Sequence, residues 1–459
     1  MTRYARIGGR LTALAAVMTC IIAALAHAAY VHLYGVEVPY WDQWGAEGLY
    51  LLKPWAEGQL TWQHLVAPWN EHRIMFTRVI SIALYEASGK TWSVLRTEYF
   101  NTFLYALIPS LMMMYVGRSD ATRKEKALMA LAIVTIAVLP YGWENTLGAF
   151  QNQFYLMILG TLAGVGLAAF GRPSIANLVV MVGIAATSIL TMGPGIVAGP
   201  AIGLVLVSRA WLSRIPWTRA LVTSAALLVV TSFGYLLTPQ LPNQAALHAQ
   251  DFRELIHALL ITAGWPASSP RAGAVLIWLP ALVGAWMIFR RRWDGTLDVL
   301  MLGLAAWTAV QIVEIAVSRG HGMAVVTPRY TDILVMGLLA NLWFGIRVAG
   351  WTNAHPITAL VRRIPVLLLV LVMTQGFLSS APVDSANMAE RRDQSLMQQT
   401  HVQAYLQTGI PAELDQPVPA IPLPDPAALR ATLGDPTIRG MLITTPTSAQ
   451  PMGTKISAH

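Results

Sequence analysis

The stretch "LTALAAVMTCIIAALAHAAYVHL", residues 11–33, decides the fold class of this chain. It contains no Asp, Glu, Lys or Arg, and it exceeds the ~20 residues that a helix needs to cross the hydrocarbon core of a bilayer. The same character recurs along the 459 residues, of which 55% are hydrophobic and 12% charged, with a mean hydropathy of +0.52. So much apolar surface cannot be buried inside a water-soluble domain. The sequence therefore predicts an all-α, polytopic membrane protein.

Eleven apolar stretches are candidates for membrane-spanning helices, and the shorter ones rely on neighbouring helices or a thinned bilayer. Their approximate ranges are 11–33, 95–117, 126–142, 154–171, 174–191, 195–208, 219–237, 273–290, 298–317, 331–348 and 364–380. The first range also fits a signal peptide, since it follows three arginines and contains "AHA" at residues 26–28. Because apolar residues continue to Leu33, we expect this segment to be retained.

The net charge of +8 comes mainly from Lys and Arg in short loops between the apolar stretches. This distribution indicates membrane topology and disfavours a nucleic-acid surface, because such residues are enriched in cytoplasmic loops. We expect the N terminus in the cytoplasm and the C terminus outside, in a bacterial inner (plasma) membrane. The clusters assigned to the cytoplasm are Arg3, Arg6 and Arg10; Arg118, Arg123, Lys124 and Lys126; Arg209, Arg214 and Arg219; Arg290, Arg291 and Arg292; and Arg347, Arg362 and Arg363.

Two apolar segments must not cross if these clusters share one side. Ile74–Tyr85 has twelve residues and would reach only about 18 Å as a helix. Its polar residues recur every four positions, which predicts an interfacial helix with one polar face formed by Arg73, Thr77, Ser81 and Tyr85. The same reasoning predicts that Leu255–Trp265 does not cross.

Several classes of site are not supported. The single cysteine, Cys20, excludes a disulfide framework and a thiolate metal cluster. There is no His-x-x-x-His pair, glycine-rich dinucleotide motif or Walker loop, and Glu254 with His257 has no obvious third ligand. We therefore expect no metal site and no cofactor, although a divalent cation stays open.

Polar residues collect instead in three loops that are predicted to open on the outer face. The first holds Asp42, flanked by Trp41 and Trp44, and then Glu71, His72 and Arg73. The others contribute Glu144 and Gln151, and Arg329 and Tyr330. A carboxylate can accept the proton of an acceptor hydroxyl, and arginines can hold a phosphate leaving group. We assign catalysis to Asp42 and Glu71. Substrate binding is assigned to Trp41, His72, Arg73, Glu144, Gln151, Arg329 and Tyr330. We expect Asp42, Glu71, Arg73, Glu144 and Arg329 to line one cavity.

Each of these residues also has a structural interpretation. Asp42 suits the N-cap of a helix that begins at Gln43, and Asn70 suits the cap of the following helix. Tryptophans are common at membrane interfaces, and Arg329 precedes a spanning helix, where arginines extend toward lipid headgroups. Glu144 and Gln151 fit a loop that ties two helices together equally well.

The first half of the chain resembles a known superfamily. A spanning helix, a long external loop with an early acid, an interfacial helix ending in "ALYEASGK" and a second spanning helix near Arg96 are similar to the C-type (GT-C) membrane glycosyltransferases. The fragment "TMGPGIVAGPAIGLVLV" is similar to a Lys-Gly-Pro turn of several members, with Met192 in place of the lysine. The resemblance covers residues 1–210, and beyond them it rests on helix count. It implies a sugar donor linked to polyprenyl phosphate and a catalytic base in the first external loop, here Asp42. Many members have two neighbouring acids where this chain has Asp42 and Gln43, so the resemblance leaves the role of Glu71 open.

These observations predict an inverting glycosyltransferase that moves a sugar from a polyprenyl-phosphate donor to an envelope glycan or lipid outside the membrane. A lipid-linked oligosaccharide polymerase or ligase is the first alternative, and a transporter or flippase the second. We expect a transmembrane domain over residues 1–380, with its external loop at 34–94, and an extracytoplasmic tail over 381–459. The tail is expected to pack over the external loops.

Overall fold

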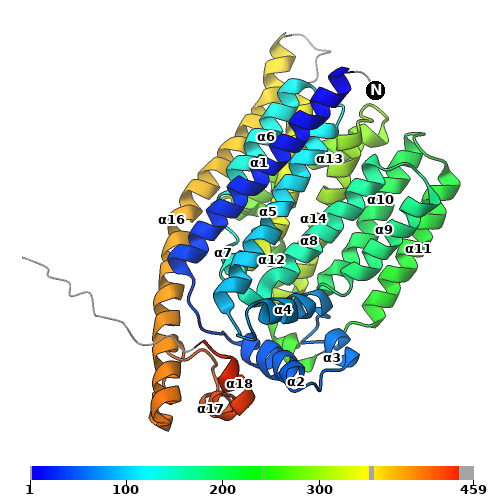
Figure 1. The fold of residues 1–459 in the computed structure, drawn as a ribbon. Coiled ribbons are helices and arrows are strands. Elements are labelled where there is room, and N and C mark those ends of the chain that lie inside the picture. Colours follow the sequence, from blue (N-terminus) through cyan, green and yellow to red (C-terminus); the bar gives the residue numbers. More distant parts are fainter. Residues whose placement is uncertain (1–2, 240, 351–355, 444–459) are drawn as a thin grey trace, which may run out of the picture.

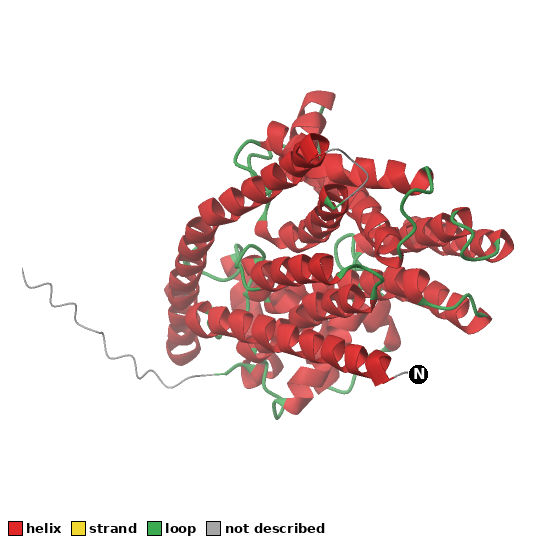
Figure 2. Cartoon of the chain, turned by 90° about the horizontal axis from the view of Figure 1, so that it is seen from above, coloured by secondary structure: helices red, strands yellow, loops and turns green. Residues whose placement is uncertain are grey.

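The computed structural model describes residues 3–239, 241–350 and 356–443. Within these ranges the chain consists of helices and connecting loops, and Figure 2 shows no strand. The longest helices run side by side as a bundle (Figure 1). The prediction of an all-α membrane-type fold is confirmed.

Nine helical stretches of the described chain are long and apolar enough to cross a membrane. They belong to α1 (Arg3–Tyr34), α5 (Val94–Arg118), α8 (Asn152–Phe170), α10 (Ala198–Trp211), α11 (Trp217–Leu236), α13 (Pro270–Phe289), α14 (Thr296–Arg319), α15 (Pro328–Ala349) and α16 (Pro356–Thr408). Two shorter helices, α6 (Arg123–Ala137) and α9 (Ile175–Ser188), run alongside them (Figure 1). These eleven helices correspond to the eleven predicted ranges.

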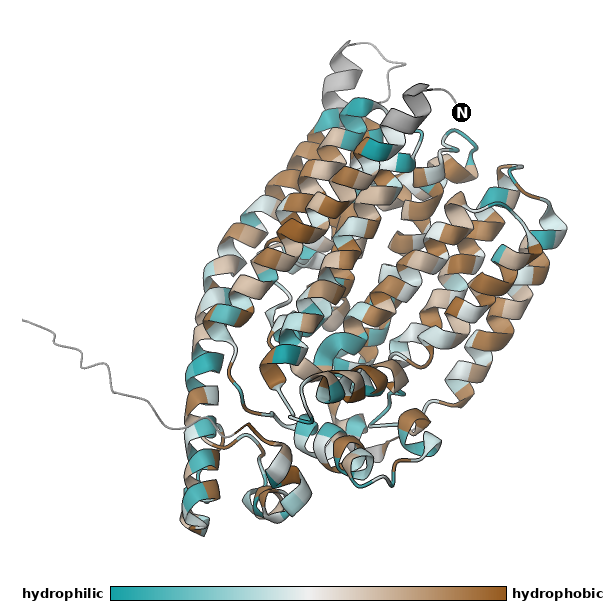
Figure 3. Ribbon diagram, viewed as in Figure 1, coloured by the Kyte–Doolittle hydropathy of each residue, from teal (hydrophilic) through white to brown (hydrophobic). Residues whose placement is uncertain are grey.

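The two ends of the bundle differ in composition. One end, which we call the Arg-rich end, carries the start of α1 and the short connections after α5, α8, α10 and α13, at the top of Figure 1. The other end, which we call the loop end, carries α2 (Lys53–Ala56), α3 (Trp62–Val66) and α4 (Met75–Ala87). Figure 3 shows apolar residues along the bundle and hydrophilic residues concentrated toward its ends. The Arg clusters that lie in the described connections therefore share one end.

Helix α4 lies across the spanning helices at the loop end, as predicted for an interfacial helix (Figure 1). Its buried residues are Thr77, Arg78, Ser81 and Tyr85, so the polar face of α4 points into the protein. The Arg78 guanidinium is fully buried and donates from Nη1 to the carbonyls of Leu65 (3.1 Å) and Ala67 (2.5 Å). It thereby fixes the loop that leads into α4.

Helix α12 (Phe252–Gly264) begins and ends near residues of the loop end. Near its start, Glu254 contacts His321 at 3.1 Å, just beyond the end of α14. Just after its last residue, the Trp265 ring packs edge-on against Tyr141, with ring centroids 5.8 Å apart. This thirteen-residue helix does not cross the bundle, in agreement with the prediction.

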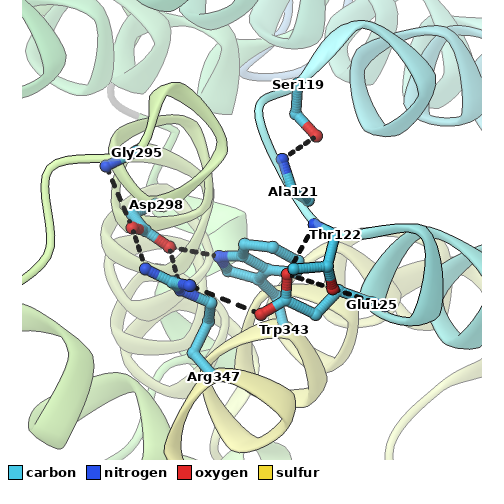
Figure 4. Close-up of polar contacts among 8 residues, drawn as sticks. All are labelled: Ser119, Ala121, Thr122, Glu125, Gly295, Asp298, Trp343 and Arg347. Atoms are coloured by element: carbon cyan, nitrogen blue, oxygen red, sulfur yellow. Dashed lines mark hydrogen bonds and ion pairs between the residues drawn. The ribbon is translucent and has the colours of Figure 1, made fainter. Parts of the chain in front are cut away.

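A buried ion network joins three helices at the Arg-rich end (Figure 4). Arg347 of α15 contacts both oxygens of Asp298 of α14, with Nε–Oδ1 at 3.1 Å and Nη2–Oδ2 at 3.2 Å. It also contacts Glu125 of α6 at 3.3 Å, and the Trp343 indole donates to Asp298 at 2.8 Å. Sequence reasoning treated Arg347 only as a topology marker, whereas the structure gives it a bidentate partner inside the protein.

The last spanning helix continues beyond the bundle and carries the tail. Helix α16 passes residue 380 without a break and ends at Thr408, and α17 (Pro426–Gly434) and α18 (Pro436–Met441) follow. The tail is joined to the first external loop by backbone hydrogen bonds, from Trp41 N to Pro422 O and from Trp92 N to Met441 O, both 2.8 Å. Apolar side chains from the tail and from the first external loop also pack together in a cluster of their own. Its buried members are Trp44, Leu52, Tyr85, Trp92, Val402, Leu414, Ile421, Leu429, Leu433, Ile438 and Met441. The predicted packing of the tail over the loops is confirmed.

Candidate functional site

The segment around Asp42 is held in an unusual backbone conformation. Trp41 has φ +47°, a left-handed value that is costly for a bulky residue and is found disproportionately at functional sites. A π-helix follows directly, from Gln43 to Leu52, and π-helical turns are also frequent at such sites. Gln43 stabilises the turn by accepting from Tyr40 N at 3.0 Å and donating to the buried Glu47 at 3.0 Å.

Asp42 itself is not a helix cap. It occupies the position before the π-helix, but its side chain makes no capping hydrogen bond, so the capping interpretation is wrong. Withdrawal from water raises the pKa of the Asp42 carboxyl, and the nearby Trp69 indole and Arg329 guanidinium only partly oppose that rise. A carboxylate with a raised pKa is a stronger proton acceptor than an ordinary aspartate.

Arg329, whose charge acts on Asp42, also pairs with a second carboxylate, that of Glu144. Its Nε lies 2.9 Å from Oε2 of Glu144, and Asn145 donates to the Arg329 carbonyl at 2.8 Å. Arg329 keeps a side-chain exposure of 43%, so part of the guanidinium remains open to a ligand. We call Asp42, Glu144 and Arg329 the Asp42 group.

A residue that sequence reasoning missed completes this group. Arg391, from the extension of α16, stacks its guanidinium over the Tyr40 ring at 3.6 Å from the centroid. Its charge also interacts with Glu98 and Glu144, while Nη1 is buried without a hydrogen-bond partner among the described residues. No sequence signal pointed to Arg391, because it lies about 350 residues from Asp42, in a stretch interpreted as a polar tail.

The row Asn70–Arg73 forms a tight turn and not the start of a helix. Trp69 and His72 exchange backbone hydrogen bonds of 2.8 and 3.0 Å, and Asn70 has φ +49°. Helix α4 begins later, at Met75, so the interpretation of Asn70 as its cap is wrong. The turn faces two ways, because the Trp69 indole approaches Asp42 while Glu71 and His72 line a cavity.

This cavity has a volume of about 210 Å³ and lies between the turn, α14 and the connection before α10. Glu71 forms an ion pair with Arg319 at the end of α14. The Gly193 N–H donates to Nδ1 of His72 at 3.3 Å, a close approach that a larger residue would crowd, since a Cβ there would sit 3.0 Å from that nitrogen. Tyr330 also lines the cavity, next in sequence to Arg329 of the Asp42 group.

The charges of Glu71 and His72 follow from burial and from their neighbours. Burial raises the pKa of Glu71, but the charge and the hydrogen bond of Arg319 oppose that rise, and the net pKa is below the ordinary value. Burial lowers the pKa of His72, which keeps the imidazole neutral and allows Nδ1 to accept the Gly193 hydrogen bond. Glu71 is therefore an anion paired with Arg319.

The predicted single cavity is wrong, because the structure divides the predicted residues. Glu71, His72 and Tyr330 line the cavity, whereas Asp42, Arg73, Glu144 and Arg329 do not. The Arg73 guanidinium donates to the carbonyls of Val66 (2.8 Å) and Leu237 (3.2 Å), and Trp41 has 47% of its surface exposed.

Gln151, the remaining predicted binding residue, packs beside Gly148 in the loop that carries Glu144. The second carboxylate of the Asp42 group is thus Glu144, which shares Arg329 with Asp42, and not Glu71.

The described residues contain no group of three or more His, Cys, Asp and Glu placed to hold a metal ion. Models of known protein families give no match to this chain, and neither do curated proteins.

Proposed function

We propose that the protein is a membrane glycosyltransferase that moves a sugar from a polyprenyl-phosphate donor to an acceptor hydroxyl on an envelope glycan or lipid. The arrangement that carries this proposal is the Asp42 group: a carboxyl with a raised pKa that caps no helix, next to the half-exposed guanidinium of Arg329. The site lies at the end of the bundle opposite the Arg-rich connections (Figure 1). By the positive-inside tendency, that end faces away from the cytoplasm.

In the proposed reaction, Asp42 accepts the proton of the acceptor hydroxyl as its oxygen attacks the anomeric carbon. The bond from that carbon to the phosphate oxygen breaks, and the electron pair leaves with the polyprenyl phosphate. Arg329 and Arg391 stabilise the departing phosphate, because arginines suit charge-assisted hydrogen bonds to phosphate oxygens. Attack opposite the leaving group inverts the anomeric configuration.

The test compares Asp42→Asn and Asp42→Ala in lipid nanodiscs supplied with polyprenyl-phosphate sugars and envelope acceptors. Both variants remove the proton acceptor, so turnover should fall by roughly 10²–10⁴-fold, the usual contribution of a general base. Thermal stability should change little, since Asp42 makes no capping hydrogen bond.

Asp251 provides the matched control, because its side chain does cap a helix by accepting from Glu254 N at 2.8 Å. Asp251→Asn should keep both stability and turnover, and Asp251→Ala should lose stability but not chemistry. If Asp42→Asn transfers sugar at more than a tenth of the wild-type rate, Asp42 is not the base. If the wild-type protein transfers no sugar from any polyprenyl-phosphate donor, the proposed function is wrong.

A further inference from the structure

The cavity beside the turn at residues 69–72 has chemistry that the transfer reaction does not use. Its volume of about 210 Å³ is many times the ~10–15 Å³ that a single water requires. Apolar side chains form much of the wall, including Met192, Ile196, Leu241 and Ile315. The cavity therefore suits an organic group with both apolar and polar parts.

Four buried oxygen atoms on the cavity wall have no hydrogen-bond partner among the described residues. They are Oε2 of Glu71, Oε1 of Gln244, Oε1 of Gln311 and Oε2 of Glu314. The Gln311 side chain is fully buried, and its amide nitrogen donates to Pro194 O at 3.0 Å, so its oxygen is the atom left over. The oxygens of Glu71, Gln244 and Gln311 are acceptors, as is Oε2 of Glu314 whenever that carboxyl is ionised, and buried acceptors left unpaired are costly. The missing ligand must therefore supply hydrogen-bond donors.

The charges on the wall favour a cation over a neutral donor. Glu71 is ionised, and its partner Arg319 also lines the cavity. Glu314 is a second carboxyl, and its Oε2 has no hydrogen-bond partner among the described residues. Of the two histidines on the wall, His72 has a pKa lowered by burial, and the side chain of His248 lies at the exposed rim. An ammonium group compensates an unpaired carboxylate and satisfies up to three acceptors at once.

The arrangement does not suit the two obvious inorganic ligands. Mg²⁺ and Ca²⁺ require about six or more oxygen ligands in close contact, and the described residues offer no group of three acidic or histidine side chains. A phosphate would meet two carboxyl groups and two unpaired amide oxygens, and its cationic partner Arg319 is already paired with Glu71. A primary ammonium fits the wall better than either.

We propose that this cavity binds a ligand bearing a primary ammonium group, with Glu314 and Glu71 facing the charge and Gln311 accepting one of its hydrogen bonds. Two sources share this chemistry, an amino sugar and an ethanolamine headgroup. Binding at this cavity does not depend on transfer at the Asp42 group, so the two proposals are tested separately.

The experiment titrates the detergent-purified full chain with glucosamine and with glucose by isothermal calorimetry at pH 6.5, without any polyprenyl donor. The two sugars differ only in an ammonium in place of one hydroxyl. We expect glucosamine to bind at least about tenfold more tightly, which corresponds to ~1.4 kcal/mol. Equal affinities, or no binding of either sugar, overturn the proposal, and this comparison needs no variant.

Variants then locate the site. Glu314→Gln keeps the shape but removes the charge and should abolish the preference for glucosamine. The matched control is Glu390→Gln, an exposed glutamate of α16 that does not line the cavity, and it should keep the preference. An unchanged preference in Glu314→Gln, with the protein folded as judged by its unfolding temperature, overturns the assignment.

Ethanolamine and MgCl₂ provide two further arms. Ethanolamine binding as tightly as glucosamine identifies a lipid headgroup as the ligand type, and much weaker binding identifies an amino sugar; both support an ammonium site. Competition by millimolar Mg²⁺ against glucosamine, lost in Glu314→Gln, would identify a metal site and overturn the proposal.

Discussion

At the scale of single residues, two features around Asp42 are unusual: its environment and the backbone that presents it. The left-handed Trp41 and the Gln43–Glu47 hydrogen bond place the carboxyl at the surface without engaging it in a cap. Partial desolvation by surrounding groups raises the pKa of this carboxyl although Asp42 is exposed, while Trp69 and Arg329 lower it. The position of Asp42 thus produces a carboxylate whose basicity depends on a neighbouring cation.

This dependence predicts a pH effect. A general base must be deprotonated, so kcat/KM should fall as the pH falls through the pKa of Asp42. Because that pKa is raised, the acid limb should lie above the ordinary aspartate value of about 3.9. Arg329→Gln removes a charge that favours the carboxylate, so the limb should move to still higher pH.

The position of the limb is measured separately from the height of the profile, so a loss of phosphate binding in Arg329→Gln does not obscure the result. Arg253→Gln changes an exposed arginine of α12 and should leave the limb in place. An acid limb that stays fixed or moves to lower pH in Arg329→Gln contradicts the assignment of Asp42 as the base.

At the scale of elements, the periodic spacing of residues predicted the structural features that depend only on local sequence. The four-residue spacing of Thr77, Ser81 and Tyr85 identified α4 and its polar face. The spacing did not predict that this face is buried against the protein. The π-helix at Gln43–Leu52 carries no comparable periodic signal. Contacts between elements that are distant in the sequence could not be predicted from the sequence either. Arg329 and Glu144 were predicted at the same end of the protein, but not as an ion pair. The approach of Arg391 depends on how far α16 extends past the bundle.

The Asp298–Arg347 pair is another contact between two helices, and it yields a prediction about the stability of the folded protein. Asp298 has a side-chain exposure of 1% and joins α14 to α15, while Glu125 adds α6. Asp298→Asn removes the bidentate partner of Arg347 and leaves Glu125 as its remaining partner, so the protein should lose about 3 kcal/mol, the lower end of the cost of breaking a buried pair. Denaturant unfolding in detergent micelles, followed by tryptophan fluorescence, measures this loss.

A matched surface pair lies four residues earlier. Asp294 pairs with Arg214, with side-chain exposures of 62% and 51%, so Asp294→Asn should cost about 0–1 kcal/mol. If both variants lose the same stability, the network in Figure 4 does not act as a buried anchor.

At the scale of the whole molecule, the two ends carry different chemistry. The connections with clustered arginines meet at the Arg-rich end, and the Asp42 group and the cavity lie at the loop end (Figure 1). The Asp42 group and the cavity adjoin there, because Arg329 and Tyr330 are consecutive and the turn at residues 69–72 contributes to both places. A substrate anchored in the membrane would thus reach both places from the same surface.

This asymmetry predicts the orientation of the protein, since loops rich in Lys and Arg stay in the cytoplasm. The test starts from Cys20→Ala, which removes the one native cysteine, and adds either Lys124→Cys or Gln59→Cys. Both positions are exposed, the first at the Arg-rich end and the second at the loop end. In intact spheroplasts a membrane-impermeant maleimide should label Gln59→Cys and spare Lys124→Cys, and permeabilised cells should label both. The reverse pattern would place Asp42 and the cavity in the cytoplasm, where a transfer to envelope acceptors has no substrate. Labelling at both positions in intact spheroplasts would mean that residues 59 and 124 lie on the same side of the membrane, and α4 would then have to cross as well as α5.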